Sequence, residues 1–275
     1  MVKSVHYKTL IYSKEAGPLS PEEKNIGVIM MSRPDVLNAI NEELLTELDD
    51  LLEEIRVDDE VRAVVIKGAG RAFSVGADLR AIQKLVEVSN ENAIRSFIKL
   101  GQNVFGKIED FDKPVIAALH GFVFGGGLDI ALTCDIRIAS EDAKIGYPEV
   151  GLGMLSAWGS CVRLAKIIGR GKAGELILTG KQLGAKEAEE IGLVNETISP
   201  SELNSIVMWT AGTVATKAPV ALKLSKRILA KSVEMSIDDG NKIMEEAFVT
   251  CFKTEDILEG LKATLEKRHP QFKGK

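Results

Sequence analysis

Two acidic residues and a run of glycines are the residues of this chain best suited to chemistry. Asp129 follows the stretch GFVFGGG of residues 121–127, and Glu149 lies twenty residues further on, in the polar break IGYPEVGLG. Two carboxyl groups in one site push their pKa values apart, so together they could hold one water molecule between them. Taken singly, Asp129 fits a charge at a helix N-terminus, and Glu149 fits a solvated loop residue.

Two strand-to-loop junctions resemble each other. VVIKGAGRAFSVGADL (residues 64–79) and VIAALHGFVFGGGLDI (residues 115–130) both run from an apolar strand through a glycine-bearing loop into the start of a helix. Loops at the carboxyl ends of strands are where open α/β proteins bind ligands. One backbone N–H from each loop would form an oxyanion hole. The alternative is that the glycines only let strand and helix pack closely.

Nucleotide and metal motifs do not fit the sequence. A G-x-G-x-x-G fingerprint on Gly68 and Gly70 needs a third glycine where Phe73 stands, and a Walker loop needs glycine where Lys166 stands. The three histidines lie far apart, so we expect no metal site. His120 closes an apolar strand, and we expect it to form a hydrogen bond there.

The elements that must position these residues alternate between strands and helices. NEELLTELDDLLEEIRVD (residues 41–58) has leucines at i, i+3, i+4 and i+7, which predicts an amphipathic helix. A first strand is expected at residues 5–13, with a polar loop leading to a returning strand at 26–32. Further strands are expected at 61–70, 113–121 and 136–140, and further helices at 90–110 and 128–135.

The pattern predicts an α/β fold with largely parallel sheets, because apolar strands with little alternation alternate with helices. From about residue 156 onward only helices are expected, the last of them over residues 238–268. We expect this helical part to pack as an extension of the core.

Composition restricts the class of protein. The chain has 275 residues, 45% hydrophobic and 27% charged, with a net charge of −5 and a pI near 5.5. This acidic balance argues against a nucleic-acid or anionic-membrane partner. The three cysteines are scattered, which suits reduced thiols in a cytoplasmic protein. Residues 1–17 hold no apolar core of a secretory signal, and polar residues interrupt the longest apolar stretch, so we expect no membrane span.

Four blocks of the sequence together resemble the crotonase superfamily, that is, the enoyl-CoA hydratases and isomerases. The blocks are RPDVLNAIN (33–41), GAGRAFSVGADL (68–79), KPVIAALHGFVFGGGLDIALTCDIRIASEDAKIGYPEVGLG (113–153) and FKTEDILEGLKATLEKRHPQF (252–272). The match runs from about residue 25 to the C-terminus.

The resemblance implies a spiral of repeated ββα units over residues 1–198 and a C-terminal helical trimerisation region over residues 199–275. It implies a homotrimer, commonly a dimer of trimers. The ligand would be an acyl-CoA thioester of fatty acid metabolism. Coenzyme A would be part of the substrate, so no separate cofactor and no metal are expected.

The resemblance also implies roles for individual residues. The oxyanion hole would consist of the backbone N–H groups of Ser74 and Gly126. Because Gly126 has no side chain, the thioester oxygen could reach its N–H. The two acids of a hydratase would be Glu149 and Asp129. Residues at positions that bind coenzyme A in relatives are Arg33, Ala72, Ser74, Asp78, Phe248 and Lys267.

This chain departs from the family pattern near the acids. Hydratases usually carry glutamate at the position of Asp129, which is one methylene shorter and must reach further or work through water. A hydratase typically reads PGAGGTQRL where this chain reads SAWGSCVRL at residues 156–164, so Trp158 and the lost proline reshape the acyl pocket. Ala157 replaces the aspartate of dienoyl-CoA isomerases and aromatic-acyl dehalogenases, which weighs against both.

Three functions follow as hypotheses. The first is a 2-enoyl-CoA hydratase, a hydro-lyase with Glu149 as the principal acid and base and with Asp129 positioning the water. The second is a Δ3-Δ2 enoyl-CoA isomerase that needs Glu149 alone. The third, from another class, is an acyl-CoA binding protein with vestigial activity.

Overall fold

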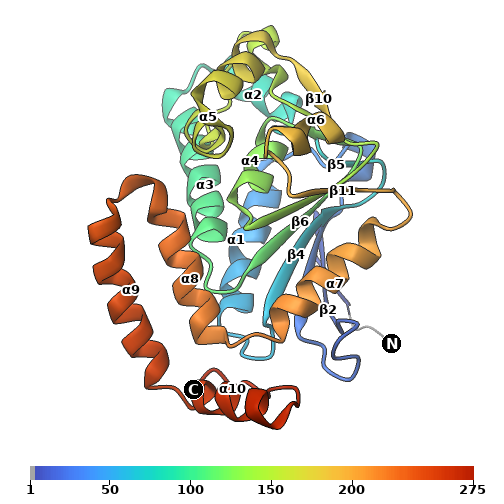
Figure 1. Ribbon diagram of the computed structural model, residues 1–275. Helices are drawn as coiled ribbons and strands as arrows, with labels where there is room; N and C mark the ends of the chain where they lie inside the picture. Colours follow the sequence, from blue (N-terminus) through green and yellow to red (C-terminus); the bar gives the residue numbers. More distant parts are fainter. Residues whose placement is uncertain (1–3) are drawn as a thin grey trace.

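A seven-stranded sheet forms the centre of the computed structural model, which describes residues 4–275 (Figure 1). Its order is β1-β2-β3-β4-β6-β8-β11. Neighbouring strands from β3 to β11 are parallel, and β1, β2 and β3 pair antiparallel. The strands are β1 (Ser4–His6), β2 (Leu10–Glu15), β3 (Ile26–Met31), β4 (Ala63–Gly68), β6 (Val115–Leu119), β8 (Ile136–Ser140) and β11 (Glu196–Ile198). The expected α/β fold with a largely parallel sheet is confirmed.

A second, smaller sheet has the order β10-β9-β7-β5, with β5, β7 and β9 parallel and β10 antiparallel. Its strands are β5 (Ala72–Ser74), β7 (Phe122–Phe124), β9 (Lys144–Gly146) and β10 (Gln182–Gly184). Three residues are too few to show an alternating pattern, so the sequence did not predict these strands. The expectation of helices alone after residue 156 is wrong at β10 and β11, whose partners β9 and β8 come from earlier in the chain.

Helices pack around the two sheets, and most of them lie where the sequence predicts. They are η1 (Pro34–Val36), α1 (Glu42–Arg56), α2 (Leu79–Val88), α3 (Glu91–Glu109), α4 (Gly126–Thr133), η2 (Pro148–Leu152), α5 (Ser160–Thr179), α6 (Ala185–Glu190), α7 (Leu203–Ala215), α8 (Pro219–Lys231), η3 (Ser232–Glu234), α9 (Ile237–Phe252) and α10 (Glu255–Glu266), where η marks a 3-10 helix. The side chain of Asn41 caps α1 by accepting the N–H of Leu44 at 3.0 Å. Gly169, with φ of 77°, breaks α5 into two helical segments.

The expected single strand at residues 5–13 is wrong, because the segment forms two antiparallel strands, β1 and β2. The carboxylate of Glu47 on α1 accepts the backbone N–H groups of Lys8 and Thr9 at 3.0 and 2.9 Å. These two donors therefore turn toward the helix and interrupt the strand. Residues 1–3, where the segment searched for a secretory signal begins, lie outside the described residues.

Both faces of the large sheet are buried, which explains the apolar runs of its strands. Along β4, Val64 and Ile66 point into one hydrophobic cluster, and Ala63 and Val65 point into another. The second cluster includes the buried face of α7. The first includes buried residues of α1, α3 and α4.

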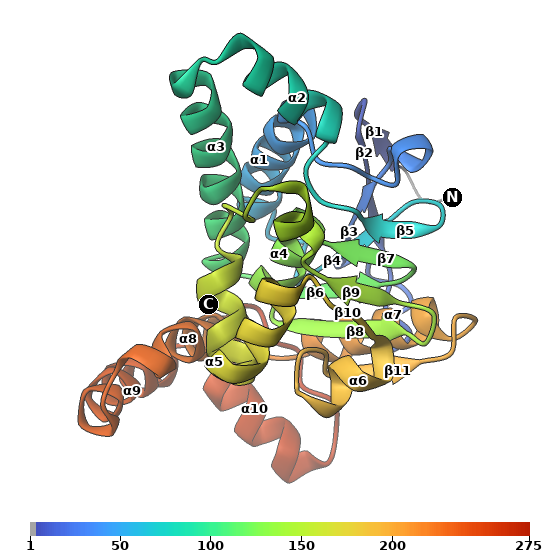
Figure 2. The ribbon, with the colours of Figure 1, turned by 90° about the horizontal axis from the view of Figure 1, so that it is seen from above.

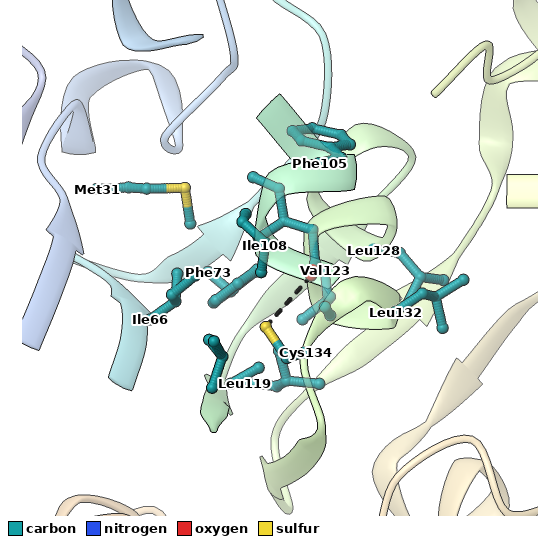
Figure 3. Packing of buried hydrophobic residues seen from close by; sticks show 14 of the residues in the cluster. Met31, Ile66, Phe73, Phe105, Ile108, Leu119, Val123, Leu128, Leu132 and Cys134 are labelled. Atoms are coloured by element: carbon teal, nitrogen blue, oxygen red, sulfur yellow. Dashed lines mark hydrogen bonds between the residues drawn. The ribbon is translucent and has the colours of Figure 1, made fainter. Parts of the chain in front are cut away.

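Figure 3 shows part of the first cluster, which includes Phe105 and Ile108 of α3 and Leu128 and Leu132 of α4. Cys134 follows α4 and is buried here, with its Sγ hydrogen-bonded to the carbonyl oxygen of Ile130 at 3.3 Å. Burial raises the pKa of this thiol to about 12. The packing of α3 against α4 fixes the helix that begins in the glycine run.

The C-terminal helices do not all extend the core. α7 covers the large sheet as expected, but α9 packs beside α8 and α10 lies at the bottom of the molecule in Figure 1. These two helices expose large apolar side chains: Ile237 is 80% exposed, Phe252 68% and Leu265 85%. The expectation that the whole helical part packs onto the core is therefore wrong for α9 and α10. The division of the chain at residue 198 stays a prediction.

Candidate active site

The two loops predicted to form an oxyanion hole lie against each other. They follow β5 and β7, which are parallel neighbours in the small sheet. A Cβ atom on Gly127 would lie 2.4 Å from the carbonyl oxygen of Ser74, so the two backbones are in close contact. The hydroxyl of the fully buried Ser74 donates to the carbonyl oxygen of Asn38 at 2.8 Å and accepts the N–H of Gly76 at 3.2 Å. These bonds hold the first loop in place.

Each glycine of the run 125–127 has a different neighbour that leaves no room for a side chain. A Cβ atom on Gly125 would lie 2.0 Å from Oε1 of Glu149, and one on Gly126 would lie 2.4 Å from Cζ3 of Trp158. Gly125 also has φ of 50°, a conformation that favours glycine. The run therefore serves the packing of a carboxyl group and an indole as well as the turn. What a side chain at position 126 would meet in this structure is Trp158.

Glu149 lies in η2 with its carboxyl group against the glycine turn. Among residues 4–275, none forms a hydrogen bond with its Oε2 atom, which is buried. Burial raises the pKa of Glu149 to about 7 from its ordinary 4.5, a hydrogen bond to its own backbone opposes this, and the negative charge of Asp129 adds to the rise. A carboxyl group with a pKa near 7 and an unpaired oxygen is suited to accepting and returning a proton.

Asp129 lies in the first turn of α4 and is fully buried. The hydroxyl of Tyr147 donates to its Oδ1 at 2.8 Å, and the hydroxyl of Ser156 donates to its Oδ2 at 2.5 Å. Burial raises the pKa of Asp129 to about 6, although these two hydrogen bonds and the positive charge of Arg163 oppose the shift. The structure thus brings both predicted acids to one place, but it gives Asp129 two protein partners.

A cavity of about 240 Å³ adjoins these groups. Gly126, Glu149 and Ser156 line part of it, and apolar residues of α2 and α3 line another part. Asp129 is not among the lining residues. The apolar lining residues on α2 and α3 are Ile82, Leu85, Val86, Ile94, Phe97 and Ile98. The site therefore consists of a polar wall that carries the predicted chemistry and an apolar wall suited to a hydrocarbon chain.

Trp158 is buried and lines the cavity. Its ring packs edge-on against Phe97 and Phe105, with centroid distances of 5.3 and 5.4 Å. A Cβ atom on Gly101 of α3 would lie 2.3 Å from the indole nitrogen, so this position also requires glycine. Two glycines, Gly101 and Gly126, thus make room for one indole. The expectation that Trp158 reshapes the acyl pocket fits this arrangement.

The predicted coenzyme A residues of the N-terminal half lie close together. The guanidinium of Arg33 forms an ion pair with Asp78 at 3.0 Å and donates to the carbonyl oxygen of Ala39. Asp78 also caps α2, and its neighbour Ala77 lines the cavity. Ala72 is buried in β5, where its carbonyl oxygen accepts the side-chain amide of Asn38 at 2.8 Å. Binding of coenzyme A by Arg33, Ala72, Ser74 and Asp78 stays a prediction.

The two predicted coenzyme A residues of the C-terminal half lie elsewhere. Phe248 is an exposed residue of α9, and Lys267 follows the last residue of α10. Figures 1 and 2 both show α9 and α10 apart from α2, which borders the cavity. Within one chain the structure does not bring Phe248 and Lys267 to the site, and their role also stays a prediction.

His120 lies at the end of β6, and its Nε2 is 3.1 Å from the carbonyl oxygen of Gly70, which confirms the expected hydrogen bond. Residues 4–275 contain no cluster of metal-binding side chains and no helix that could cross a membrane.

Sequence reasoning missed two polar residues of the site, Tyr147 and Ser156, and the apolar wall on α2 and α3. The signal for Ser156 was present, because the departure from the family pattern at residues 156–164 coincides with the shortening of Glu to Asp at 129. Read together, the two changes indicate that the residues at 129 and 156 are in contact.

Comparison with known proteins places the chain in a family. Residues 21–275 match the family "Enoyl-CoA hydratase/isomerase", and the chain belongs to this family. Its crotonase-like fold is shared with an enoyl-CoA hydratase from Bacillus anthracis. The two structures match over 100% of this chain and 99% of the other chain, with 32% sequence identity and a TM-score of 0.88. The family and fold inferred from the sequence are confirmed.

Curated relatives are similar over most of their length. A short-chain-enoyl-CoA hydratase from Clostridium acetobutylicum is 42% identical over 90% of this chain and 94% of its own. A crotonyl-CoA hydratase from Syntrophomonas wolfei is 40% identical over 91% of this chain and 95% of its own.

Proposed function

We propose that this protein is a 2-enoyl-CoA hydratase that adds water reversibly to the double bond of a short-chain acyl-CoA thioester. The observation that carries the proposal is Glu149, which lines an apolar cavity together with Gly126 and whose carboxyl group, with one unpaired oxygen, lies against Gly125. The names of the curated relatives support the same reaction.

In the proposed reaction, the thioester oxygen accepts hydrogen bonds from the N–H groups of Ser74 and Gly126. Gly126 is the first residue of α4, so its N–H has no partner within the helix. Negative charge that develops on the thioester oxygen is stabilised there by the two donors and the helix dipole.

Glu149 moves one proton in this scheme. Its carboxylate accepts a proton from water while the water oxygen bonds to C3, and the electron pair of the double bond passes to the thioester oxygen. Protonated Glu149 then gives this proton to C2 as the enolate returns its electrons. The sum is one water added, and the enzyme is unchanged. The reaction uses only protein groups and the substrate, so we propose that no separate cofactor takes part.

The test is product analysis with a panel of enoyl-CoA thioesters in ¹⁸O-labelled water. Hydration adds the mass of labelled water, whereas double-bond migration leaves the mass unchanged. We expect labelled 3-hydroxyacyl-CoA from 2-butenoyl-CoA. Binding of the thioesters without turnover of any of them would instead support an acyl-CoA binding protein.

One observation favours a second candidate, Δ3-Δ2 enoyl-CoA isomerisation. Glu149 lines the cavity and Asp129 does not, which suits a reaction that needs one acid. The variant Asp129→Asn separates the two functions, because loss of this carboxylate should reduce hydration strongly and isomerisation little. Unimpaired hydration in this variant would contradict the two-acid mechanism.

We further propose a homotrimer or a dimer of trimers in the cytoplasm. The exposed apolar residues of α9 and α10 support self-association, since monomers seldom expose such a surface. A neighbouring copy would also explain how Phe248 and Lys267 could contribute to a coenzyme A site. The three free cysteines support a reducing compartment. Light scattering of the purified protein measures the assembly.

A further inference from the structure

The two acids of the site meet the cavity in different ways. Glu149 lines the cavity, whereas Asp129 is fully buried and does not. Ser156 lines the cavity and also donates its hydroxyl hydrogen to Oδ2 of Asp129 at 2.5 Å. Ser156 therefore stands between the buried carboxylate and the space that the substrate would enter.

We propose that Ser156 is a catalytic residue that contacts the attacking water, and that Asp129 is a positioning residue that acts through Ser156. This inference rests on the proposed hydratase function. Because the hydroxyl hydrogen of Ser156 is committed to Asp129, the lone pairs of its oxygen remain to accept a hydrogen bond. The water donates one hydrogen bond to the oxygen of Ser156 and one to the carboxylate of Glu149, and its own oxygen faces C3 of the substrate.

The two departures from the family pattern point to the same assignment. This chain carries aspartate at 129 and serine at 156, where the resemblance to the family implies glutamate and proline. A carboxylate withdrawn from the cavity is thus accompanied by a hydroxyl that reaches from it to the cavity wall.

Tyr147 provides a matched comparison within the same carboxylate. Its hydroxyl donates to Oδ1 of Asp129 at 2.8 Å, but Tyr147 is buried and does not line the cavity. One hydroxyl donor therefore lies on the cavity side of Asp129 and one on the buried side. If Ser156 only held Asp129 in place, the two hydroxyls would be equivalent in their effect on turnover.

The experiment measures hydration of 2-butenoyl-CoA by wild type, Ser156→Ala, Tyr147→Phe and Ser156→Thr. We expect kcat to fall about 100-fold in Ser156→Ala with little change in KM, since a reactant misplaced by about 1 Å commonly costs this much. In Tyr147→Phe it should fall less than about 10-fold. Ser156→Thr keeps the hydroxyl and should retain at least about a tenth of wild-type kcat.

The pH profile supplies a readout that a structural role would not change. The ionisable groups acting on Asp129 are Glu149, Tyr147 and Arg163. In wild type, protonation of Glu149 and of Asp129 should both reduce kcat as the pH falls. In Ser156→Ala, the hydrogen bonds that connect Asp129 to the water are lost, so protonation of Asp129 no longer affects kcat. The fall of kcat toward low pH should therefore be less steep than in wild type.

The double variant Asp129→Glu/Ser156→Ala completes the test, because the longer carboxylate can occupy the space of the lost hydroxyl. We expect it to hydrate faster than Ser156→Ala alone. Equal losses in Ser156→Ala and Tyr147→Phe, or an unaltered acid limb in Ser156→Ala, would overturn the proposal. If Ser156→Ala does not fold, Ser156→Thr decides: a folded Ser156→Thr enzyme, which keeps the hydroxyl, with less than about a tenth of wild-type kcat would overturn the proposal. Wild-type protein that hydrates no 2-enoyl-CoA would instead refute the proposed function itself.

Discussion

Helices α4 and α2 border the same cavity but are packed in opposite ways. All eight residues of α4 are buried, whereas none of the ten residues of α2 is. Leu79, Val86 and Val88 of α2 are each more than half exposed. In Figure 2, α4 lies in the middle of the molecule and α2 lies at its upper edge.

The difference separates two tasks of the site. α4 carries the N–H of Gly126 and the carboxylate of Asp129, whose positions must be held to a fraction of an ångström for catalysis. α2 contributes apolar contacts, which tolerate changes of shape at modest cost. We therefore expect substitutions on the α4 side to affect turnover, and substitutions on the α2 side to affect which acyl chain is accepted.

The largest effect is expected from Glu149→Gln, which removes the proton carrier from the polar wall of the cavity. Turnover should fall by about 10²- to 10⁴-fold while the fold is kept. Steady-state hydration kinetics measure the loss, and circular dichroism checks the fold. The control is Glu141→Gln, an exposed carboxylate that pairs only with Lys186 at 3.8 Å among its described ion-pair partners. A Glu149→Gln enzyme with more than half of wild-type turnover would remove Glu149 from the mechanism.

The next effect concerns the N–H of Gly126. Gly126→Pro deletes this donor and should reduce kcat about 100-fold or more. Proline suits the first position of a helix, but its Cβ atom would press on Trp158. Gly126→Ala makes the same contact and keeps the N–H, so the difference between the two variants measures the donor. Equal losses would show that displacement of Trp158, and not the hydrogen bond, limits turnover.

A smaller effect is expected on the α2 side. Leu85→Ala widens the apolar wall and should raise kcat/KM for longer acyl chains relative to 2-butenoyl-CoA by about 10-fold. Turnover of 2-butenoyl-CoA should change only a few-fold. Val88→Ala, on the same helix but outside the cavity lining, is the matched control. A loss of turnover in Leu85→Ala as large as in Gly126→Pro would contradict the division of tasks.

The smallest effect is on stability, and it depends on pH. Burial raises the pKa of Glu149 to about 7 from 4.5, so the folded protein binds this proton more tightly than the unfolded chain. The free energy of unfolding should therefore fall, through this group, as the pH rises from about 4.5 to about 7. The side chain at position 149 in Glu149→Gln is neutral at every pH. The Tm of this variant minus the Tm of wild type should therefore be larger at pH 8 than at pH 5. Parallel Tm curves of the two proteins would show that the pKa is not raised.

Sequence predicted those parts of the fold and site that local patterns determine. The amphipathic spacing of α1 and the apolar run of β4 were sufficient to place both elements. The two acids were found because carboxyl groups are reactive. The glycine run was found because glycine lowers the stability of a regular element unless a turn or a close approach requires it. The strands β5 and β7, which hold the two loops together, were not found, because three residues carry no period and their pairing is long-range.

The same reason explains why Ser156 was missed. A serine in a loop has no pattern of its own, and its meaning depends on Asp129, 27 residues earlier in the chain. Likewise, the glycines at 101 and 126 lie far apart in sequence, and only the fold shows that both accommodate Trp158. Interactions between distant residues decide these positions, so their meaning shows only when both positions of a pair are considered together.

The burial of Cys134 has a consequence for how rare openings of this protein can be followed. Its thiol lies in the hydrophobic cluster to which α3 and α4 both contribute, and its raised pKa leaves little thiolate at neutral pH. A thiol reagent can therefore modify it only when the cluster opens, whereas Cys161 is exposed and Cys251 is partly exposed. In a variant with Cys161 and Cys251 replaced by serine, the labelling rate of Cys134 would measure how often the hydrophobic cluster that packs against α4 opens.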